Sequence, residues 1–426
     1  MEKLRDQLKL VIVGHVDHGK STLIGRLLFD TDSLPEGKVE EIERICRKLG
    51  REMEFAFVMD HLEEEQVQGI TIDTAQIFFR TGKRRYVIID APGHKEFVKN
   101  MLTGASQAEA ALLIVDACDG VREQTRRHAC LLRMFGLEQV IVVINKMDLV
   151  GYSRARFEAV KHEISKLLCP LGITPKHTIP ISARSGDNIV WPSDQMPWYK
   201  GPTVLDGLDS FIPKEPGLNQ ALRFPVQDIY QVQGRKILVG RVEAGIMRQG
   251  EEVTFLPQEI RAKVRSIEIL WKEKTEAGAG ECIGITTDEP VYIERGAVAC
   301  AGGATPRITS LLQTNMIWMS SRPFRPGEQL LLRVATQEVP VDISVEKRMD
   351  SSTLEEITEH PGTVLETEIA QVSIRTRQPI VIEDFNQVQE LGRFVLVRDL
   401  DIVAGGIIAD ASSAFGKQAL AGSLIA

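Results

Sequence analysis

The sequence predicts an α/β domain, with a mostly parallel sheet covered by helices on both faces, followed by two small β-barrel domains. Over roughly the first 210 residues, short β-branched runs alternate with longer amphipathic segments, the pattern of parallel strands and their crossover helices. Further along, short strand-like runs are separated by Gly and Pro turns, as small barrels require. We expect domains over residues 1–213, 214–304 and 305–426.

The bulk properties agree with a multidomain globular protein. A chain of 426 residues exceeds what one hydrophobic core usually organises. With 51 Lys and Arg against 59 Asp and Glu, the net charge of −8 does not favour nonspecific binding to nucleic acid or anionic lipid. The six cysteines form no CxxC pair, and no signal peptide or membrane span is recognisable. These features predict reduced thiols and a soluble cytoplasmic protein.

Five apolar runs supply the strands predicted for the first domain. Their near-continuous hydrophobicity is typical of strands buried on both faces. They are KLVIV (9–13), YVIID (86–90), ALLIVDA (111–117), QVIVVIN (139–145) and HTIPIS (177–182). Apolar residues three or four apart predict an amphipathic helix over residues 39–49, and the prolines of residues 196–217 indicate a linker.

Two series of strand-like runs follow the linker. The first comprises RFPVQDIY, KILVGRVEAG, EEVTFLP, AKVRSIEIL and ECIGITT. The second, between residues 313 and 399, comprises QTNMIWM, QLLLRVAT, VPVDISVEKRM, VLETEIAQVSIRT, QPIVIEDF and GRFVLVRD. Each series predicts one barrel. The final segment FGKQALAGSLIA has no clear periodicity, so it is either a frayed tail or a docking segment.

The segment GHVDHGKS, residues 14–21, fits the phosphate-binding pattern G-x-x-x-x-G-K-[ST] between a predicted strand and a predicted helix. Gly14 and Gly19 let successive backbone N–H groups converge on phosphate oxygens at the positive end of the helix dipole. Lys20 can reach the β- and γ-phosphates, and the Ser21 hydroxyl can ligate Mg²⁺. The loop therefore predicts a P-loop. Its histidines, His15 and His18, are expected to shape it rather than transfer protons.

A second motif, DAPGH, begins where the run YVIID ends. Asp90 therefore stands at the carboxyl end of a strand, where it can hold Mg²⁺ through a water molecule. The Gly93 N–H can donate to the γ-phosphate, which would make the following segment sensitive to the presence of that phosphate.

The tetrapeptide NKMD, residues 145–148, predicts which base is bound. Guanine presents two adjacent donors that one carboxylate can accept together, and adenine has no such pair. Asp148 therefore favours guanine. Asn145 can brace the loop, and the stem of Lys146 can cover one face of the base. The segment Ser182-Ala183 can supply a backbone N–H to guanine O6. The first domain is thus predicted to be a P-loop GTPase domain.

Two further residues are expected to serve hydrolysis. Thr71, in GITID, is the candidate second hydroxyl ligand of Mg²⁺, and His94 is the candidate catalytic residue that orients the attacking water. The predicted metal ligands are then Ser21, Thr71 and Asp90. The predicted nucleotide-binding residues are Gly14, His15, Val16, Asp17, His18, Gly19, Lys20, Ser21, Thr22, Asp90, Gly93, Asn145, Lys146, Asp148, Ser182 and Ala183.

These motifs and the two trailing barrels resemble the translation-factor GTPases, the group that contains elongation factor Tu and elongation factor 1A. Within that group, GVREQTRRHACLLRMFGLEQVIVVINKMDLVGYS, MPWYKGPTVLDGL and LGRFVLVRD resemble the large GTPase subunit of bacterial sulfate adenylyltransferase. DAPGHKEFVKNM is nearer the elongation-factor wording, and Gln68 replaces the arginine often seen before GIT. The resemblance covers nearly the whole chain.

Membership of the sulfate-activating group implies that GTP hydrolysis drives the synthesis of adenosine 5′-phosphosulfate by a smaller catalytic subunit from ATP and sulfate. We take this as the leading expectation. An elongation factor that delivers aminoacyl-tRNA shares every nucleotide motif and would need a basic, stacking-capable RNA surface on the barrels. A third class, an ATP-dependent small-molecule kinase or a nucleotide-sensing scaffold, is disfavoured as a kinase by NKMD. A membrane partner is not expected, and nucleic acid is expected only for the elongation factor.

Overall fold

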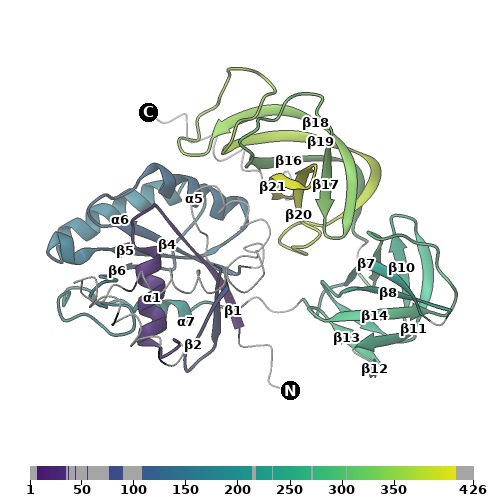
Figure 1. Cartoon of the computed structure of the whole chain (residues 1–426), viewed down its shortest axis with the longest axis horizontal. Coiled ribbons are helices and arrows are strands. Elements are labelled where there is room, and N and C mark those ends of the chain that lie inside the picture. Colours follow the sequence, from purple (N-terminus) through teal and green to yellow (C-terminus); the bar gives the residue numbers. More distant parts are fainter. Residues whose placement is uncertain are drawn as a thin grey trace. The chain divides into compact units, whose positions relative to one another are not determined.

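The computed structural model describes residues 7–34, 37, 44, 55, 76–89, 108–213, 217–232, 234–269, 272–303 and 305–408. The chain forms two compact units, the first made mainly of residues 1–213 and the second mainly of residues 214–350 and 354–417 (Figure 1). Within the described part of the chain, no helix combines the length and the apolar character needed to cross a membrane.

The first unit contains a six-stranded sheet in the order β2-β3-β1-β4-β5-β6. All neighbouring strands are parallel except the edge pair β2 and β3, which is antiparallel. The strands are β1 (Gln7–Gly14), β2 (Gln76–Arg80), β3 (Arg85–Ile89), β4 (Ala110–Asp116), β5 (Gln139–Asn145) and β6 (His177–Pro180). The mostly parallel sheet predicted from the five apolar runs is therefore confirmed.

Helices cover both faces of this sheet. Figure 1 shows α1 (Lys20–Asp30) and α7 (Val204–Asp209) on one face and α5 (Glu123–Met134) and α6 (Arg154–Leu168) on the other. Alternate strand residues such as Leu10 and Ile114 join the core cluster that contains residues of α1 and α7. The intervening residues of these strands are also buried. Burial on both faces explains why the strand segments are almost uninterrupted apolar runs.

Strand β2 is an element that the pattern of apolar runs did not predict. Its residues alternate, because Ile77 and Phe79 are buried while Phe78 is 61 % exposed. Such alternation is typical of an edge strand that faces solvent on one side. The helix expected over residues 39–49 lies almost entirely outside the described residues, and so do Thr71, Asp90, Gly93 and His94.

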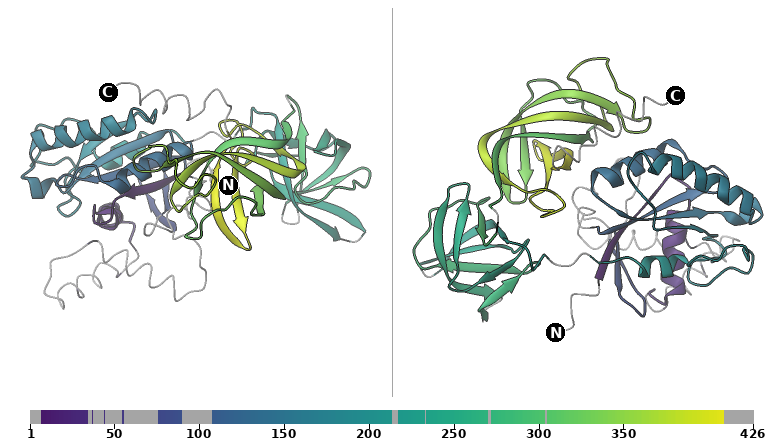
Figure 2. Two further views of the ribbon diagram at one scale, coloured as in Figure 1. Left: turned by 90° about the horizontal axis from the view of Figure 1, so that it is seen from above. Right: turned by 180° about the vertical axis from the view of Figure 1, so that it is seen from behind.

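The second unit consists of two barrels, as predicted, and each is built of six antiparallel strands, one more than the five runs expected for the first barrel. In the first barrel the order β10-β15-β7-β8-β14-β11 is closed by pairing of β11 with β10. The second barrel closes in the order β16-β19-β18-β17-β20-β21. Each barrel has its own apolar core. Figure 2 shows both barrels from two further directions.

The strands of the first barrel are β7 (Leu222–Val232), β8 (Arg235–Arg241), β10 (Glu252–Leu256), β11 (Ile260–Ile269), β14 (Cys282–Thr287) and β15 (Val298–Ala301), with the short strands β9 (Ile246–Arg248), β12 (Lys272–Lys274) and β13 (Glu276–Gly278) beside them. Those of the second are β16 (Arg307–Trp318), β17 (Leu330–Val334), β18 (Gln337–Asp350), β19 (Glu368–Ile382), β20 (Arg393–Arg398) and β21 (Asp401–Ile407).

A mixed apolar and charged seam joins the two barrels. Its apolar part is a buried cluster of Ala244, Leu256, Val298 and Cys300 from the first barrel with Val381, Val388 and Leu391 from the second. Beside it, both Nε and Nη2 of Arg223 lie 2.7 Å from Glu383 Oε1. Both side chains are at least nine-tenths buried, so this pair belongs to the interior of the unit.

Candidate nucleotide-binding site

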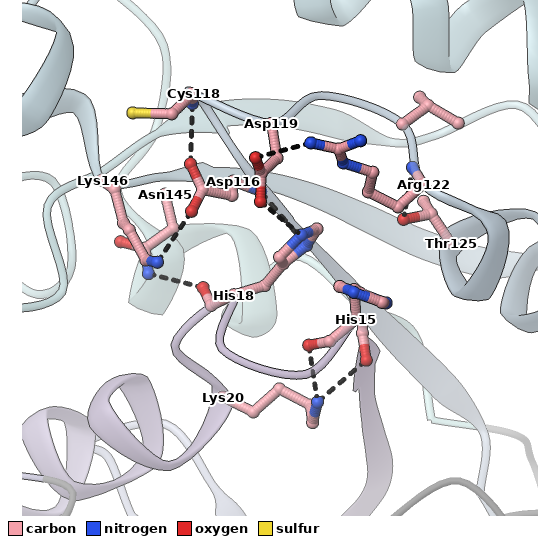
Figure 3. A network of polar contacts seen from close by, with 12 residues as sticks. His15, His18, Lys20, Asp116, Cys118, Asp119, Arg122, Thr125, Asn145 and Lys146 are labelled. Atoms are coloured by element: carbon pink, nitrogen blue, oxygen red, sulfur yellow. Dashed lines mark hydrogen bonds and ion pairs between the residues drawn. The ribbon is translucent and has the colours of Figure 1, made fainter.

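The phosphate loop spans residues 15–19, between the end of β1 and the start of α1 (Figure 3). Both of its glycines have a steric reason to be glycine. A Cβ on Gly14 would lie 2.5 Å from the Ile114 carbonyl oxygen on β4, and a Cβ on Gly19, whose φ is +91°, would lie 2.4 Å from the Asn145 side-chain nitrogen. The loop is thus packed against the ends of two neighbouring strands.

Lys20, the first residue of α1, folds back over this loop. Its Nζ donates hydrogen bonds to the carbonyl oxygens of Gly14, at 2.8 Å, and His15, at 2.9 Å. These contacts hold the ammonium group against the start of the loop, within the segment where the sequence motif places phosphate. Ser21 follows at the exposed first turn of α1, and Val16 and Asp17 are also exposed.

His18 is the buried member of the loop. Only 1 % of it is exposed, and its Nδ1 accepts a hydrogen bond from the Asp116 N–H at 3.3 Å. Desolvation by burial lowers the pKa of the imidazole to about 4, although a backbone hydrogen bond with Ile114 and the carboxylates of Asp116 and Asp119 act in the opposite direction. His18 is therefore neutral at physiological pH and acts as a packing and accepting group.

Asn145 joins the phosphate loop to the loops that follow β5 and β6. Its buried Nδ2 donates to the His18 carbonyl oxygen at 2.9 Å, and its Oδ1 accepts from the Ala183 N–H at 2.9 Å. This is the bracing contact expected from the motif. Because the Ala183 N–H is already bonded to Asn145, guanine O6 would compete with that amide oxygen for the same hydrogen.

Asp148 lies in the short 3-10 helix Met147–Val150, directly after β5. Its Oδ1 accepts a hydrogen bond of 2.7 Å from the buried Ser182 hydroxyl. One carboxylate oxygen is thereby oriented by the protein, which supports the use of this group for a paired contact with a base. Strands β5 and β6 are parallel neighbours, which brings together five predicted base-binding residues spread over 39 positions of the sequence. They are Asn145, Lys146, Asp148, Ser182 and Ala183.

The structure adds one residue that motif matching did not single out. Asp116, at the end of β4, forms an ion pair of 2.7 Å with Lys146. A sequence signal was present, since Asp116 ends the apolar run ALLIVD in the sequence, as Asp90 ends YVIID.

Comparison with known proteins places these features in a family. The model of the elongation factor Tu GTP binding domain matches residues 5–214, and that of the GTP-eEF1A C-terminal domain-like family matches residues 312–409. Elongation factor 1-alpha of Pyrococcus furiosus is 41 % identical, with 96 % of this chain and 98 % of the relative covered. The chain belongs to the elongation factor Tu and elongation factor 1-alpha family of GTPases.

A second elongation factor 1-alpha matches equally well. Elongation factor 1-alpha of Thermococcus gammatolerans is 42 % identical over the same shares of both chains. A solved structure of sup35 complexed with GMPPNP is 25 % identical, covers 95 % of this chain and 94 % of its own, and has a TM-score of 0.43.

The expectation of a sulfate adenylyltransferase subunit is wrong, and so is the smaller catalytic subunit expected as its partner. Relatives matched over almost their whole length are elongation factors 1-alpha. The physical reason is that GTP, the loops that hold it and the barrel strands are common to the family. The segments that suggested sulfate activation lie in this shared framework, so they do not identify a partner.

Proposed function

We propose that this protein is a translation elongation factor that carries aminoacyl-tRNA to the ribosome in its GTP form and leaves after hydrolysis. The observation that carries the proposal is the match to elongation factor 1-alpha along 96 % of the chain, which includes the barrels as well as the nucleotide domain. A cytoplasmic location accompanies this role.

Within this role, the predicted site residues have distinct tasks. Residues 14–22 hold the phosphates, and Asn145, Lys146 and Asp148 with Ser182 and Ala183 hold guanine. Ser21, Thr71 and Asp90 offer hydroxyl and carboxylate oxygens, the donor types that Mg²⁺ prefers, and the exposed position of Ser21 on the first turn of α1 fits this task. Bound magnesium would neutralise phosphate charge, Gly93 would contact the γ-phosphate, and His94 would orient water.

The first barrel also offers a feature suited to RNA. The ring of Tyr292 is 82 % exposed, and Lys236 Nζ lies 4.6 Å from its centroid. Lys236 follows Arg235, the first residue of β8. An exposed aromatic face beside cationic groups is the combination that stacks on unpaired bases and attracts phosphate. A negative net charge does not prevent such a local patch.

The test measures protection of the aminoacyl ester bond of charged tRNA from hydrolysis, with the protein bound either to GDP or to a nonhydrolysable GTP analogue. We expect protection in the GTP form only. Tyr292→Ala should weaken tRNA binding about tenfold, since base stacking contributes roughly 1–3 kcal/mol, without changing GDP affinity. Tyr230→Ala, a half-exposed tyrosine on β7, is the matched control. Absence of protection in both nucleotide forms contradicts the proposal.

A further inference from the structure

We propose that Asp116 is a positioning residue for guanine-nucleotide binding, because its carboxylate holds the Lys146 side chain in place before the nucleotide arrives. This inference rests on guanine-nucleotide binding and is independent of the role in elongation. Neither Asp116 nor its contact with Lys146 belongs to the sequence motifs that identify the nucleotide site.

The ion pair between these residues is short and shielded from solvent. Asp116 Oδ2 lies 2.7 Å from Lys146 Nζ, and the side chain of Asp116 is only 4 % exposed while that of Lys146 is 30 % exposed. Figure 3 shows the lysine reaching across from β5 to the carboxylate at the end of β4. A carboxylate so deeply buried needs a partner, and within the described residues Lys146 is the cation that forms an ion pair with it.

Two hydrogen bonds also fix the second carboxylate oxygen and the backbone N–H of Asp116. Its Oδ1 accepts a hydrogen bond of 2.7 Å from the Cys118 N–H, which orients the carboxylate. Its own N–H donates to His18 Nδ1 in the phosphate loop. One residue therefore contacts both the loop that holds phosphate and the loop that holds the base, so its position is set from both sides.

Lys146 needs such an anchor for two reasons. Its backbone lies in the left-handed region, with φ of +63°, which is unfavourable for a lysine and persists only when neighbouring contacts hold it. Its long side chain also loses rotamer freedom when it is fixed against a base. Since the ion pair already restricts the side chain in the protein, nucleotide binding orders fewer bonds, which favours a slow dissociation.

The test compares nucleotide release from wild type and Asp116→Asn, by stopped-flow displacement of a fluorescent GDP. The substitution keeps size and removes the charge, and we expect release about tenfold faster with an association rate changed less than about twofold. GTP should be affected by the same factor, because both nucleotides share the base. Glu158→Gln is the control, since Glu158 on α6 is 52 % exposed and pairs with Lys161 at 3.8 Å outside the nucleotide site.

A double-mutant cycle then separates positioning from general support of the fold. Lys146→Met keeps most of the stem and removes the ammonium group, so Asp116→Asn in that background should alter GDP release less than about twofold. An undiminished effect in the Lys146→Met background would overturn the proposal, as would a wild-type release rate in Asp116→Asn alone. Failure of Asp116→Asn to fold would overturn it too, because the carboxylate would then serve the fold rather than the lysine.

Discussion

His18 illustrates how burial of a single side chain decides its chemistry. The imidazole is enclosed between the phosphate loop and the end of β4, where Asp116 N–H donates to it. Protonation would convert the accepting Nδ1 into a donor and place a positive charge in a desolvated position. The folded protein therefore keeps His18 neutral, and the histidine contributes to loop shape rather than to proton transfer.

This burial makes stability depend on pH. The pKa of His18 is about 4 in the folded protein and 6.5 in the unfolded chain, so between these values the unfolded chain binds a proton that the folded chain does not. Stability from this group is present above pH 6.5 and is lost as the pH falls toward 4, with a loss of about 2 kcal/mol at pH 5. Urea unfolding at pH 7.5 and at pH 5 measures this loss of stability.

Replacement of the histidine provides the comparison for that measurement. When the pH is lowered from 7.5 to 5, the free energy of unfolding of His18→Gln should fall less than that of wild type. The difference between the two falls should be about 2 kcal/mol. His162→Gln, on the exposed face of α6, should retain the wild-type pH difference. An unchanged difference in His18→Gln would show that another group is responsible.

The last residue of β1, Gly14, lies so close to β4 that there is no room for a side chain. Gly14 pairs with Ile114, and an added Cβ would lie 2.4 Å from the Ile114 side chain and 2.5 Å from its carbonyl oxygen. A carbonyl oxygen within a buried strand cannot move aside without disturbing the ladder. The glycine is therefore required by the packing of the sheet in addition to any contact with phosphate.

Gly14→Ala should consequently displace the end of β1 and destabilise the protein by about 3 kcal/mol, the upper part of the range for overpacking. GDP affinity should fall in parallel, because the phosphate loop starts at this residue. Thermal unfolding with and without GDP measures both effects. Gly82→Ala is the control, since no atom lies within 4 Å of an added Cβ there, and it should melt as wild type does.

The second unit behaves as one body because its two barrels share buried groups. Arg223 and Glu383 are 6 % and 10 % exposed, and they lie next to the apolar cluster of the seam. Removal of the Glu383 charge takes a buried ion-pair contact from Arg223, which is far more costly than loss of an exposed pair. We therefore expect the two barrels to unfold as one cooperative unit.

Glu383→Gln should therefore lower the free energy of unfolding by roughly 3 kcal/mol and separate the melting of the barrels in calorimetry. The exposed pair of Arg248 and Glu276, 3.8 Å apart, supplies the control, because Glu276→Gln should change stability by less than about 1 kcal/mol. A single unshifted transition in Glu383→Gln would show that the apolar cluster alone holds the barrels together.

Glu243, the residue before Ala244 of the seam, has the opposite pH response to His18. Burial and the nearby carboxylate of Glu390 raise the pKa of Glu243 to about 7, against the opposing effect of Arg241 and Arg393. Between pH 4.5 and about 7 the folded chain therefore holds a proton there that the unfolded chain releases. The stability from this group is present below pH 4.5 and is lost as the pH rises to about 7. Two groups with opposite responses explain why the His18 measurement needs a paired variant.

Hydrophobic runs and a few motifs in the sequence determined the fold class and the class of nucleotide. Both signals are local, because strand and helix periods and the spacing of G-x-x-x-x-G-K-S are set by neighbours in the chain. The edge strand β2 was missed because its alternating pattern is short. The partner was predicted wrongly, because partner choice depends on surface chemistry that nucleotide motifs do not encode.

Only the tertiary structure decided which side chains support the site. Asp116 and Lys146 are 30 positions apart, and they meet because β4 and β5 pair in parallel with Asp116 opposite Asn145. Likewise, Arg223 and Glu383 meet only through the packing of two barrels. Register and packing are outcomes of the whole fold, since they balance contacts distant in sequence, and no local pattern specifies them.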